Sequence, residues 1–335
     1  MMMHFLYLAG TWFLFASILA TLGLFLYDWL QKDRQITGKH VVVTGGSSGI
    51  GKSVAISAAK RGAHVTIIAR NAKRLEEATQ EISKAVIDSS QKVQYLSLDL
   101  SSDYAVVEKA LWSLEDEAGP IFMLINCAGG AVCGKLEDTS ASDIQGQISM
   151  NFLSSVYPTK ALVGRMKSRG EGIIVITGSV ASLFGIYGFS IYSSTKFALR
   201  GFAEALHMET KPYGVSVTLS FPPDTDTPGF ANENKSKPME TRLISESGGL
   251  VNPDVVAEKT MSDALRGKFF SFVGFEGGIV SAVCAGMSPP SSFTALVIQV
   301  LLMGPLRLVS AGLLLHFNGI VNKCKHDRNK NKKLE

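Results

Sequence analysis

Short apolar, β-branched runs alternate with segments of helical spacing between His40 and Gly267, and this alternation constrains the fold most. The expected strands are 40–45, 63–69, 93–99, 122–129, 172–179 and 215–221. They show no polar alternation, which indicates strands buried on both faces of a parallel sheet. Helical patterns lie between them at 48–61, 71–85, 105–118, 143–167 and 192–213. Repeated βα units of this kind predict a doubly wound α/β sheet, a Rossmann fold, with right-handed crossovers.

A glycine-rich turn follows the first of these strands. It reads Thr44-Gly45-Gly46-Ser47-Ser48-Gly49-Ile50-Gly51. Glycines here permit a tight turn, close approach of the backbone to a pyrophosphate, and packing of a helix on the sheet. The next helix then points its free N–H groups and the positive end of its dipole at the phosphate. The turn therefore predicts a dinucleotide site whose contacts are Gly45, Ser47, Ser48, Gly49, Ile50 and Gly51.

The end of the second strand decides which nicotinamide cofactor the site would prefer. An NAD site carries an acidic residue there, whereas this chain has Arg70 and, one turn later, Arg74. Two guanidinium groups can hold a 2′-phosphate, so the pattern predicts NADPH, although both could be solvent-facing charges at a helix start. Asp99 ends the third strand, where it could accept a hydrogen bond from adenine or cap the next helix, and Leu100 adjoins it.

Four polar side chains follow the loop in an order that suits ketone or alcohol chemistry. Tyr192 and Lys196 are four residues apart on a predicted helix and share one face. Ser179 ends the fifth strand, and Asn151 lies in the preceding long helix. A free tyrosine has a pKa of about 10, which a neighbouring ammonium and an oxidised nicotinamide are expected to lower. Tyr192 could then exchange the substrate proton, Ser179 could hold the carbonyl oxygen, and Asn151 could anchor a water.

Together these motifs resemble the short-chain dehydrogenase/reductase family. The resemblance rests on T-G-x-x-x-G-x-G, N-x-A-G at 126–129, and the order Asn, Ser, Tyr-x-x-x-Lys, and it covers about residues 38–270. It implies a catalytic tetrad of Asn151, Ser179, Tyr192 and Lys196, with hydride transfer from the nicotinamide. It also implies further cofactor contacts at Asn126, Ala128, Gly129, Tyr192, Lys196, Pro222 and Thr227. One departure is Pro222-Pro223-Asp224, where most members have Pro-Gly.

A narrower resemblance, to membrane-bound reductases of long-chain sphingoid-base ketones, is carried by residues 221–245 and by the apolar ends of the chain. It implies NADPH-dependent reduction of a 3-keto group. The family resemblance also implies a homo-oligomer, a dimer or tetramer that pairs through the two long helices at 143–167 and 192–213. Residues 222–250, the lid, are expected to be a long Pro/Gly/Ser-rich loop over the substrate. Its acids could meet a substrate ammonium or simply keep the loop soluble: Asp224, Asp226, Glu233, Glu240 and Glu246.

Two other functions stay open from the residues alone. The same tetrad would serve a membrane-bound reductase of steroids or retinoids. A non-catalytic NADPH-binding scaffold needs no Tyr–Lys pair, so the intact tetrad argues against it.

A net charge of +4 is too mild to indicate a nucleic-acid partner. The four cysteines form no C-x-x-C pair and the six histidines no H-E-x-x-H motif, so no metal site is expected.

An uncharged segment from Phe5 to Tyr27 precedes the α/β region. A helix of this length reaches across a bilayer core of roughly 30 Å. Basic residues come only after the segment, at Lys32, Arg34 and Lys39. This pattern favours a start-anchor over a cleaved signal peptide, and it predicts that the following chain faces the cytosol.

A second apolar segment, 293–317, is interrupted by Gln299, Pro305 and Arg307. A spanning helix and an interfacial or re-entrant helix pair both stay open, because a mid-span arginine is costly. The last four residues, KKLE, resemble a dilysine retrieval signal of endoplasmic-reticulum membrane proteins. The predicted organisation is an anchor at 1–30, a reductase domain at 38–275, an apolar membrane-associating region at 276–320 and a basic cytosolic tail at 321–335.

Overall fold

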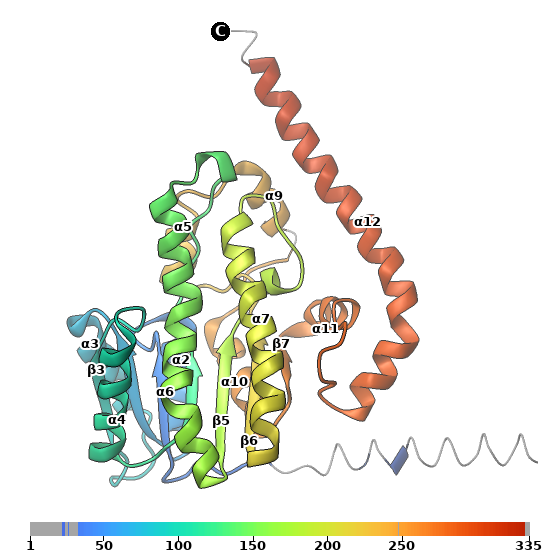
Figure 1. The fold of residues 1–335 in the computed structure, drawn as a ribbon. Helices are drawn as coiled ribbons and strands as arrows, with labels where there is room; N and C mark the ends of the chain where they lie inside the picture. Colours follow the sequence, from blue (N-terminus) through green and yellow to red (C-terminus); the bar gives the residue numbers. More distant parts are fainter. Residues whose placement is uncertain (1–21, 24–25, 27–32, 247, 332–335) are drawn as a thin grey trace, which may run out of the picture.

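The computed structural model describes residues 22–23, 26, 33–246 and 248–331. Almost all of the predicted anchor and the KKLE sequence lie outside the described residues. Seven parallel strands form one sheet in the order β3-β2-β1-β4-β5-β6-β7. The strands are β1 (His40–Thr44), β2 (His64–Ala69), β3 (Val93–Ser97), β4 (Ile121–Asn126), β5 (Gly172–Thr177), β6 (Val215–Phe221) and β7 (Phe270–Phe272). The doubly wound parallel sheet predicted from the apolar runs is confirmed (Figure 1).

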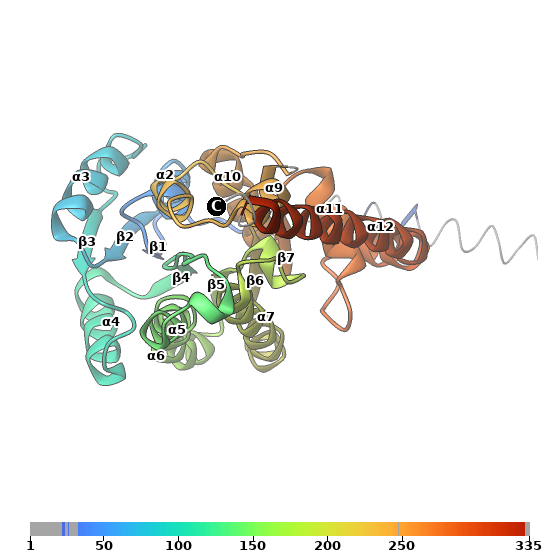
Figure 2. The ribbon, with the colours of Figure 1, turned by 90° about the horizontal axis from the view of Figure 1, so that it is seen from above.

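Helices cover both faces of this sheet, as the view from above shows (Figure 2). One face carries α2 (Gly49–Ala59), α3 (Ala72–Ser83) and α10 (Pro253–Leu265); the other carries α4 (Tyr104–Ala118), α6 (Ser154–Arg169) and α7 (Ser190–Thr210). Successive strand residues alternate between the two cores: Val43 packs with the first helix layer, and Val42 with the second. Burial of both faces explains why the strands read as continuous apolar runs.

The long helix predicted at 143–167 is formed by three consecutive pieces. These are α5 (Ala141–Ile148), a π-helical turn η2 (Ser149–Leu153) and α6. Ser140 caps the start, where its side chain accepts a hydrogen bond from the Asp143 backbone. The π turn contains Asn151, and widened turns of this kind recur at functional sites. Short 3-10 turns lie at η1 (Leu136–Asp138), η3 (Val180–Ser182) and η4 (Lys211–Tyr213).

The lid is not the continuous loop that its Pro and Gly content predicted. It contains two helices, α8 (Pro228–Glu233) and α9 (Met239–Glu246). Thr227 caps α8 by accepting a hydrogen bond from the Phe230 backbone, and Pro228 occupies the first helical turn, where a missing N–H costs nothing. A bridge between Thr225 and Val251 ties the two ends of the lid together.

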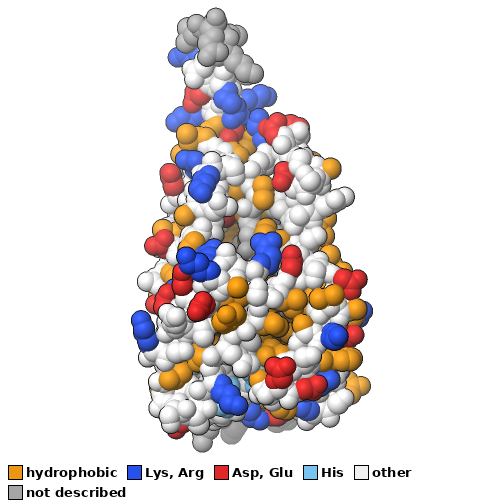
Figure 3. All heavy atoms as spheres, turned by 90° about the vertical axis from the view of Figure 1, so that its left-hand side faces the viewer, with side chains coloured by type: hydrophobic (Ala, Val, Ile, Leu, Met, Phe, Trp, Pro, Cys, Tyr) orange, Lys and Arg blue, Asp and Glu red, His pale blue; other side chains and the backbone are white. Residues whose placement is uncertain are grey.

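The C-terminal region forms two helices, α11 (Gly274–Val283) and α12 (Phe293–Asn331). Helix α12 continues through Pro305, and Arg307 donates to Ser310 on the same helix. It is long and apolar enough to cross a membrane, and the most apolar part of it has no buried residue. It starts beside α11 and runs past α9 (Figure 1). Basic side chains gather towards its C-terminal end (Figure 3).

Candidate active site

The glycine loop lies where the carboxyl ends of β1 and β4 meet. Gly45 adopts a left-handed conformation, with φ of 65°, and a Cβ atom there would lie 2.8 Å from the carbonyl oxygen of Cys127. Gly49 is also left-handed, and a Cβ there would lie 2.9 Å from the Thr227 methyl group. Residues with a side chain would therefore clash at both positions. The loop thus leaves a cradle of bare backbone at the start of α2, which fits a pyrophosphate.

The glycine loop contacts the lid where Gly49 lies against the Thr227 methyl group. The start of the lid therefore covers the cofactor cradle. On the β4 side, the Thr44 hydroxyl accepts hydrogen bonds from the backbone N–H groups of Cys127 and Ala128, each at 3.1 Å. Asn126 is buried and donates to Thr159 at 3.1 Å. These bonds fix the N-x-A-G segment beside the glycine loop, so the structure brings these two predicted cofactor segments together.

The predicted 2′-phosphate residues lie at the carboxyl end of β2. Arg70 directly follows the strand, and Arg74 lies in the first turn of α3, which Asn71 caps. Both side chains are exposed. Asp99 lies near Arg70, whose charge helps to lower the carboxyl pKa after the larger effect of the hydrogen bond from the Ser101 backbone. Asp99 does not cap the next helix: that residue is Asp103, so this alternative reading of Asp99 is wrong.

Asn151 and Lys196 face the segment that ends β4. The Asn151 side chain is fully buried, and its Oδ1 accepts from the Gly130 backbone at 2.9 Å. Among the described residues its Nδ2 has no acceptor, which leaves a buried donor for a water or a cofactor. A Cβ atom on Gly129 would lie 2.8 Å from Asn151 Oδ1 and 3.6 Å from Lys196 Nζ. The wide π turn therefore places an amide beside the lysine.

Tyr192 lies between Ser179 and Lys196 in space. The Ser179 side chain is close enough to the Tyr192 hydroxyl to lower its pKa. The Lys196 ammonium donates to the Thr177 carbonyl at 2.9 Å and lies 5.6 Å from the centre of the Tyr192 ring. The structure thus gathers all four predicted tetrad residues at the carboxyl ends of β4 and β5. This is the edge at which open α/β sheets bind ligands.

Burial has the largest effect on the pKa of both Tyr192 and Lys196. It raises the pKa of Tyr192, against the opposing effect of the neighbouring Ser179 side chain, and the carboxylates of Glu233 and Asp224 raise it further. It lowers the pKa of Lys196 to about 8. The expectation that the ammonium lowers the tyrosine pKa is therefore not met in the protein without a cofactor, because desolvation of the phenolate is the larger effect.

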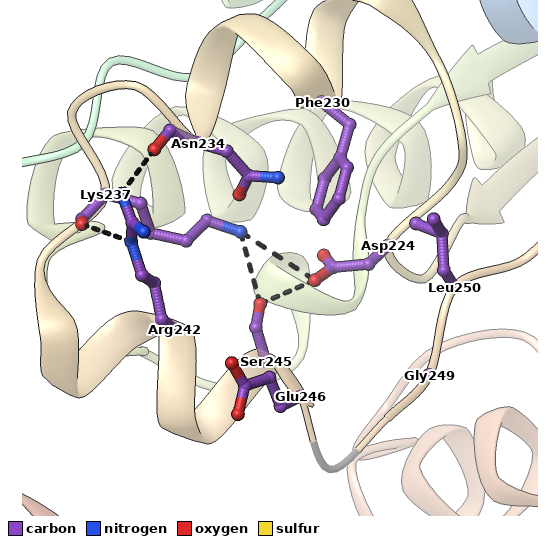
Figure 4. Close-up of a pocket in the computed structure, with 9 residues that line it drawn as sticks. All are labelled: Asp224, Phe230, Asn234, Lys237, Arg242, Ser245, Glu246, Gly249 and Leu250. Atoms are coloured by element: carbon purple, nitrogen blue, oxygen red, sulfur yellow. Dashed lines mark hydrogen bonds and ion pairs between the residues drawn. The ribbon is translucent and has the colours of Figure 1, made fainter.

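The lid adds Lys237 and Arg242, which no catalytic or cofactor motif includes, to the acids expected there. A cavity of about 420 Å³ is lined by Asp224, Phe230, Asn234, Lys237, Arg242, Ser245, Glu246, Gly249 and Leu250 (Figure 4). Lys237 reaches across it towards Asp224 and Ser245. Cys133, on the loop after β4, is buried near the same charged groups, and burial raises the pKa of its thiol to about 12. In the sequence, the spacing of four residues between Glu233 and Lys237 is the one pattern that indicates this group of charged side chains.

A second cavity, of about 610 Å³, lies between the start of α7 and α12. Apolar side chains from three parts of the chain line it: Ile186, Tyr187, Phe197, Ile244, Leu314, Phe317 and Val321. The lining also includes Ser190 and Ser193, which flank Tyr192 in sequence. An apolar cavity thus borders the segment that carries the candidate catalytic tyrosine.

Comparison with known proteins gives the same picture of the fold. Residues 39–238 match the family described as short chain dehydrogenase. The chain is 46% identical over 293 residues to the 3-ketodihydrosphingosine reductase of Bos taurus, and the match covers 88% of each protein. It is 45% identical over 293 residues to the 3-dehydrosphinganine reductase of Danio rerio, again over 88% of each. The structure of L-sorbose reductase from Gluconobacter frateurii, complexed with NADPH and L-sorbose, is 25% identical, with a TM-score of 0.63 over 72% of this chain and 97% of that one.

Proposed function

The chain belongs to the short-chain dehydrogenase family, whose members are oxidoreductases that bind a nicotinamide cofactor, and we propose that it reduces the 3-keto group of 3-ketodihydrosphingosine with NADPH. One observation carries the substrate. The identity to the 3-ketodihydrosphingosine reductase of Bos taurus extends over 293 residues, beyond the 39–238 region that defines the family. The likeness therefore includes residues outside the region that the family shares, and function resides in particular sites and not in the fold alone.

Protonation of the tyrosine supports reduction of a ketone. The nicotinamide, when bound, supplies the hydride. Tyr192 would donate its proton to the substrate oxygen, and its raised pKa keeps that proton in place at neutral pH. Ser179, whose side chain lies beside the Tyr192 hydroxyl, would hold the same oxygen. Lys196 and Asn151 would position the cofactor and a proton-carrying water, since both face Gly129 at the end of β4.

The choice of NADPH over NADH rests on the carboxyl end of β2. Arg70 and Arg74 are exposed there, where an acidic residue would serve a ribose 2′-hydroxyl. Their guanidinium groups would bind the 2′-phosphate, with Asp99 and Leu100 beside the adenine. Gly45, Ser47, Ser48, Gly49, Ile50 and Gly51 would hold the pyrophosphate, and Asn126, Ala128, Gly129, Pro222 and Thr227 would line the rest of the cleft.

We also propose that the protein acts at the endoplasmic-reticulum membrane with its catalytic domain in the cytosol. The proposal keeps the organisation inferred from sequence: an anchor at 1–30, a reductase domain at 38–275, a membrane-associating region at 276–320 and a basic tail at 321–335. The exposed apolar surface of α12 supports it. A substrate with a long alkyl chain partitions into bilayers, so a membrane address brings enzyme and substrate together.

A turnover assay tests the proposed reaction. The full-length protein in microsomes should oxidise NADPH in proportion to the 3-ketodihydrosphingosine added and should form dihydrosphingosine. A steroid ketone and a retinoid aldehyde at equal concentration serve as the competing substrates. Faster turnover of either would replace the proposed substrate, and no turnover of any of the three would favour a non-catalytic binding protein.

A further inference from the structure

The lid holds one ammonium group in a buried polar cage. The Lys237 side chain is 1% exposed, and its Nζ lies 2.7 Å from Glu233 Oε1 and 3.8 Å from Asp224 Oδ2. Its third polar contact is the Ser245 hydroxyl at 3.3 Å, which itself donates to Asp224 at 2.5 Å (Figure 4). Burying a cation so completely is costly unless carboxylates and hydrogen bonds compensate it. The local structure is therefore arranged to accept an ammonium.

Aromatic faces complete the cage and connect it to the catalytic tyrosine. Lys237 Nζ lies 4.5 Å from the centre of the Phe230 ring and 5.8 Å from that of Phe189. Rings at this distance attract cations through their negative faces. The Phe189 ring in turn lies 5.3 Å from the Tyr192 ring. The Phe189 side chain thus lies between a cation held in this cage and Tyr192, the candidate proton donor.

The cage contains more negative charge than its lysine balances. Asp224 and Glu233 are two carboxylates for one Lys237 ammonium. Arg242 also lines the cavity, but its guanidinium donates to the backbone carbonyls of Lys237 and Asn234. Burial raises the pKa of Glu233, although the Lys237 ammonium opposes this shift. A second cation would remove this deficit.

We propose that Asp224 and Glu233 bind the ammonium group of the substrate and thereby select a 2-amino ketone, an inference that rests on the reaction proposed above. The amino carbon of 3-ketodihydrosphingosine is bonded directly to the carbonyl carbon. A ketone oxygen at Tyr192 and Ser179 therefore requires an ammonium site immediately beside them. Asp224 follows β6 at the same sheet edge, and the Val180 backbone next to Ser179 bonds to Pro222, two residues before it.

The structure separates these two carboxylates from the other acids of the lid. Glu240 is buried in an ion pair with Arg328 of α12, whereas Asp226 and Glu246 are exposed, and Lys237 Nζ pairs with Glu233 and Asp224. Of the five lid acids that could meet an ammonium, the geometry therefore points to these two.

Two ketones of equal chain length test the site: 3-ketodihydrosphingosine and the analogue in which hydrogen replaces the amino group. Wild-type protein should reduce the amino ketone with the higher kcat/KM. Glu233→Gln and Asp224→Asn should each lower the kcat/KM ratio of amino to des-amino ketone by roughly tenfold to a hundredfold, as expected for loss of one charge-assisted hydrogen bond. Asp226→Asn, a matched change on an exposed lid acid, should leave the ratio unchanged.

Each outcome separates this proposal from the reaction on which it rests. If wild-type protein reduces both ketones with equal kcat/KM, or if the two variants keep the wild-type ratio, the ammonium site is wrong while the reductase activity stands. If wild-type protein reduces neither, the proposed reaction itself fails. Turnover of the des-amino ketone by each variant shows that the variant is folded. A variant inactive on both ketones is replaced by the conservative change at the same position, Glu233→Asp or Asp224→Glu, which should lower the ratio below the wild-type value.

Discussion

Burial acts in opposite directions on the two ionisable groups of the candidate catalytic pair. It raises the pKa of the Tyr192 phenol and lowers that of the Lys196 ammonium to about 8. At neutral pH the phenol therefore carries its proton, and most of the lysine is still charged. The spacing of four residues placed the two side chains on one face, but it carries no information on how much water surrounds them. This is why the pair was predictable and the direction of the tyrosine shift was not.

Replacing the tyrosine by phenylalanine removes only the hydroxyl that would donate the proton. We expect Tyr192→Phe to lower kcat by a factor of about 10²–10⁴, the usual contribution of general acid catalysis. NADPH binding, measured by quenching of protein fluorescence, should stay near the wild-type value because the glycine loop is untouched. Tyr213→Phe, on an exposed tyrosine, is the control. Full reductase activity of Tyr192→Phe would contradict the assignment.

Lys196 gives a prediction for stability against pH. Its pKa is about 8 in the folded protein and 10.5 in the reference state, so the unfolded chain binds more protons between these values. Stability therefore rises with pH from about 8 to 10.5, and the cost of the buried charge is fully present below pH 8. Lys196→Met should stabilise the cofactor-free protein at pH 7 by roughly 1–3 kcal/mol, after the loss of its hydrogen bond to Thr177.

Urea unfolding of wild type and Lys196→Met at pH 7 and near pH 10 measures this difference. The gain should shrink as pH rises, because the wild-type lysine loses its proton and no longer carries a buried charge. Lys92→Met, which removes an exposed lysine just before β3, serves as the control. A gain that stays constant with pH would contradict the buried-charge argument.

At the scale of elements, the strands and the glycine loop were predictable because one physical cause dominates each. Strands buried on both faces must be apolar throughout, and the turn after β1 leaves no room for a Cβ atom at Gly45. The lid was harder. Pro228 and Gly229 suggest a loop, yet proline in a first turn with a Thr227 cap starts a helix. The cage around Lys237 depends on how α8 and α9 pack, which no local pattern records.

The carboxyl end of β2 gives a prediction for cofactor choice. Arg70→Ser combined with Arg74→Ser should raise the KM for NADPH relative to that for NADH by roughly tenfold or more, because charge-assisted hydrogen bonds contribute about 1.5–3 kcal/mol each. Lys73→Ser, on the same exposed turn of α3, is the matched control and should leave the ratio unchanged. Steady-state kinetics with both cofactors measure it. An unchanged ratio in the double variant would show that other residues read the 2′-phosphate.

At the scale of the whole molecule, both ends of α12 contact the same catalytic domain. Just before the helix starts, Ser291 accepts a hydrogen bond from the Phe270 backbone in β7. Towards its end, Phe317 stacks near Phe184, and Arg328 pairs with Glu240 of the lid. Because both ends contact one domain, this arrangement does not favour a helix that crosses the bilayer. The large exposed apolar side chains between them would instead lie in the membrane interface, which agrees with the interfacial alternative left open by Pro305 and Arg307.

Labelling of single introduced cysteines in sealed microsomes distinguishes the two arrangements. Met287→Cys lies before α12, Asn329→Cys near its end, and Leu301→Cys on its exposed apolar surface. With the domain in the cytosol and α12 in the interface, a membrane-impermeant maleimide should label the first two positions without detergent, and Leu301→Cys only after detergent is added. The unsubstituted protein gives the background from its four native cysteines. If α12 spans the bilayer, only one of the two flanking positions reacts before detergent. If neither reacts until the vesicles are opened, the domain faces the lumen and the proposed orientation is reversed. The positive charges after residue 27 would then lie on the lumenal side, against the positive-inside rule.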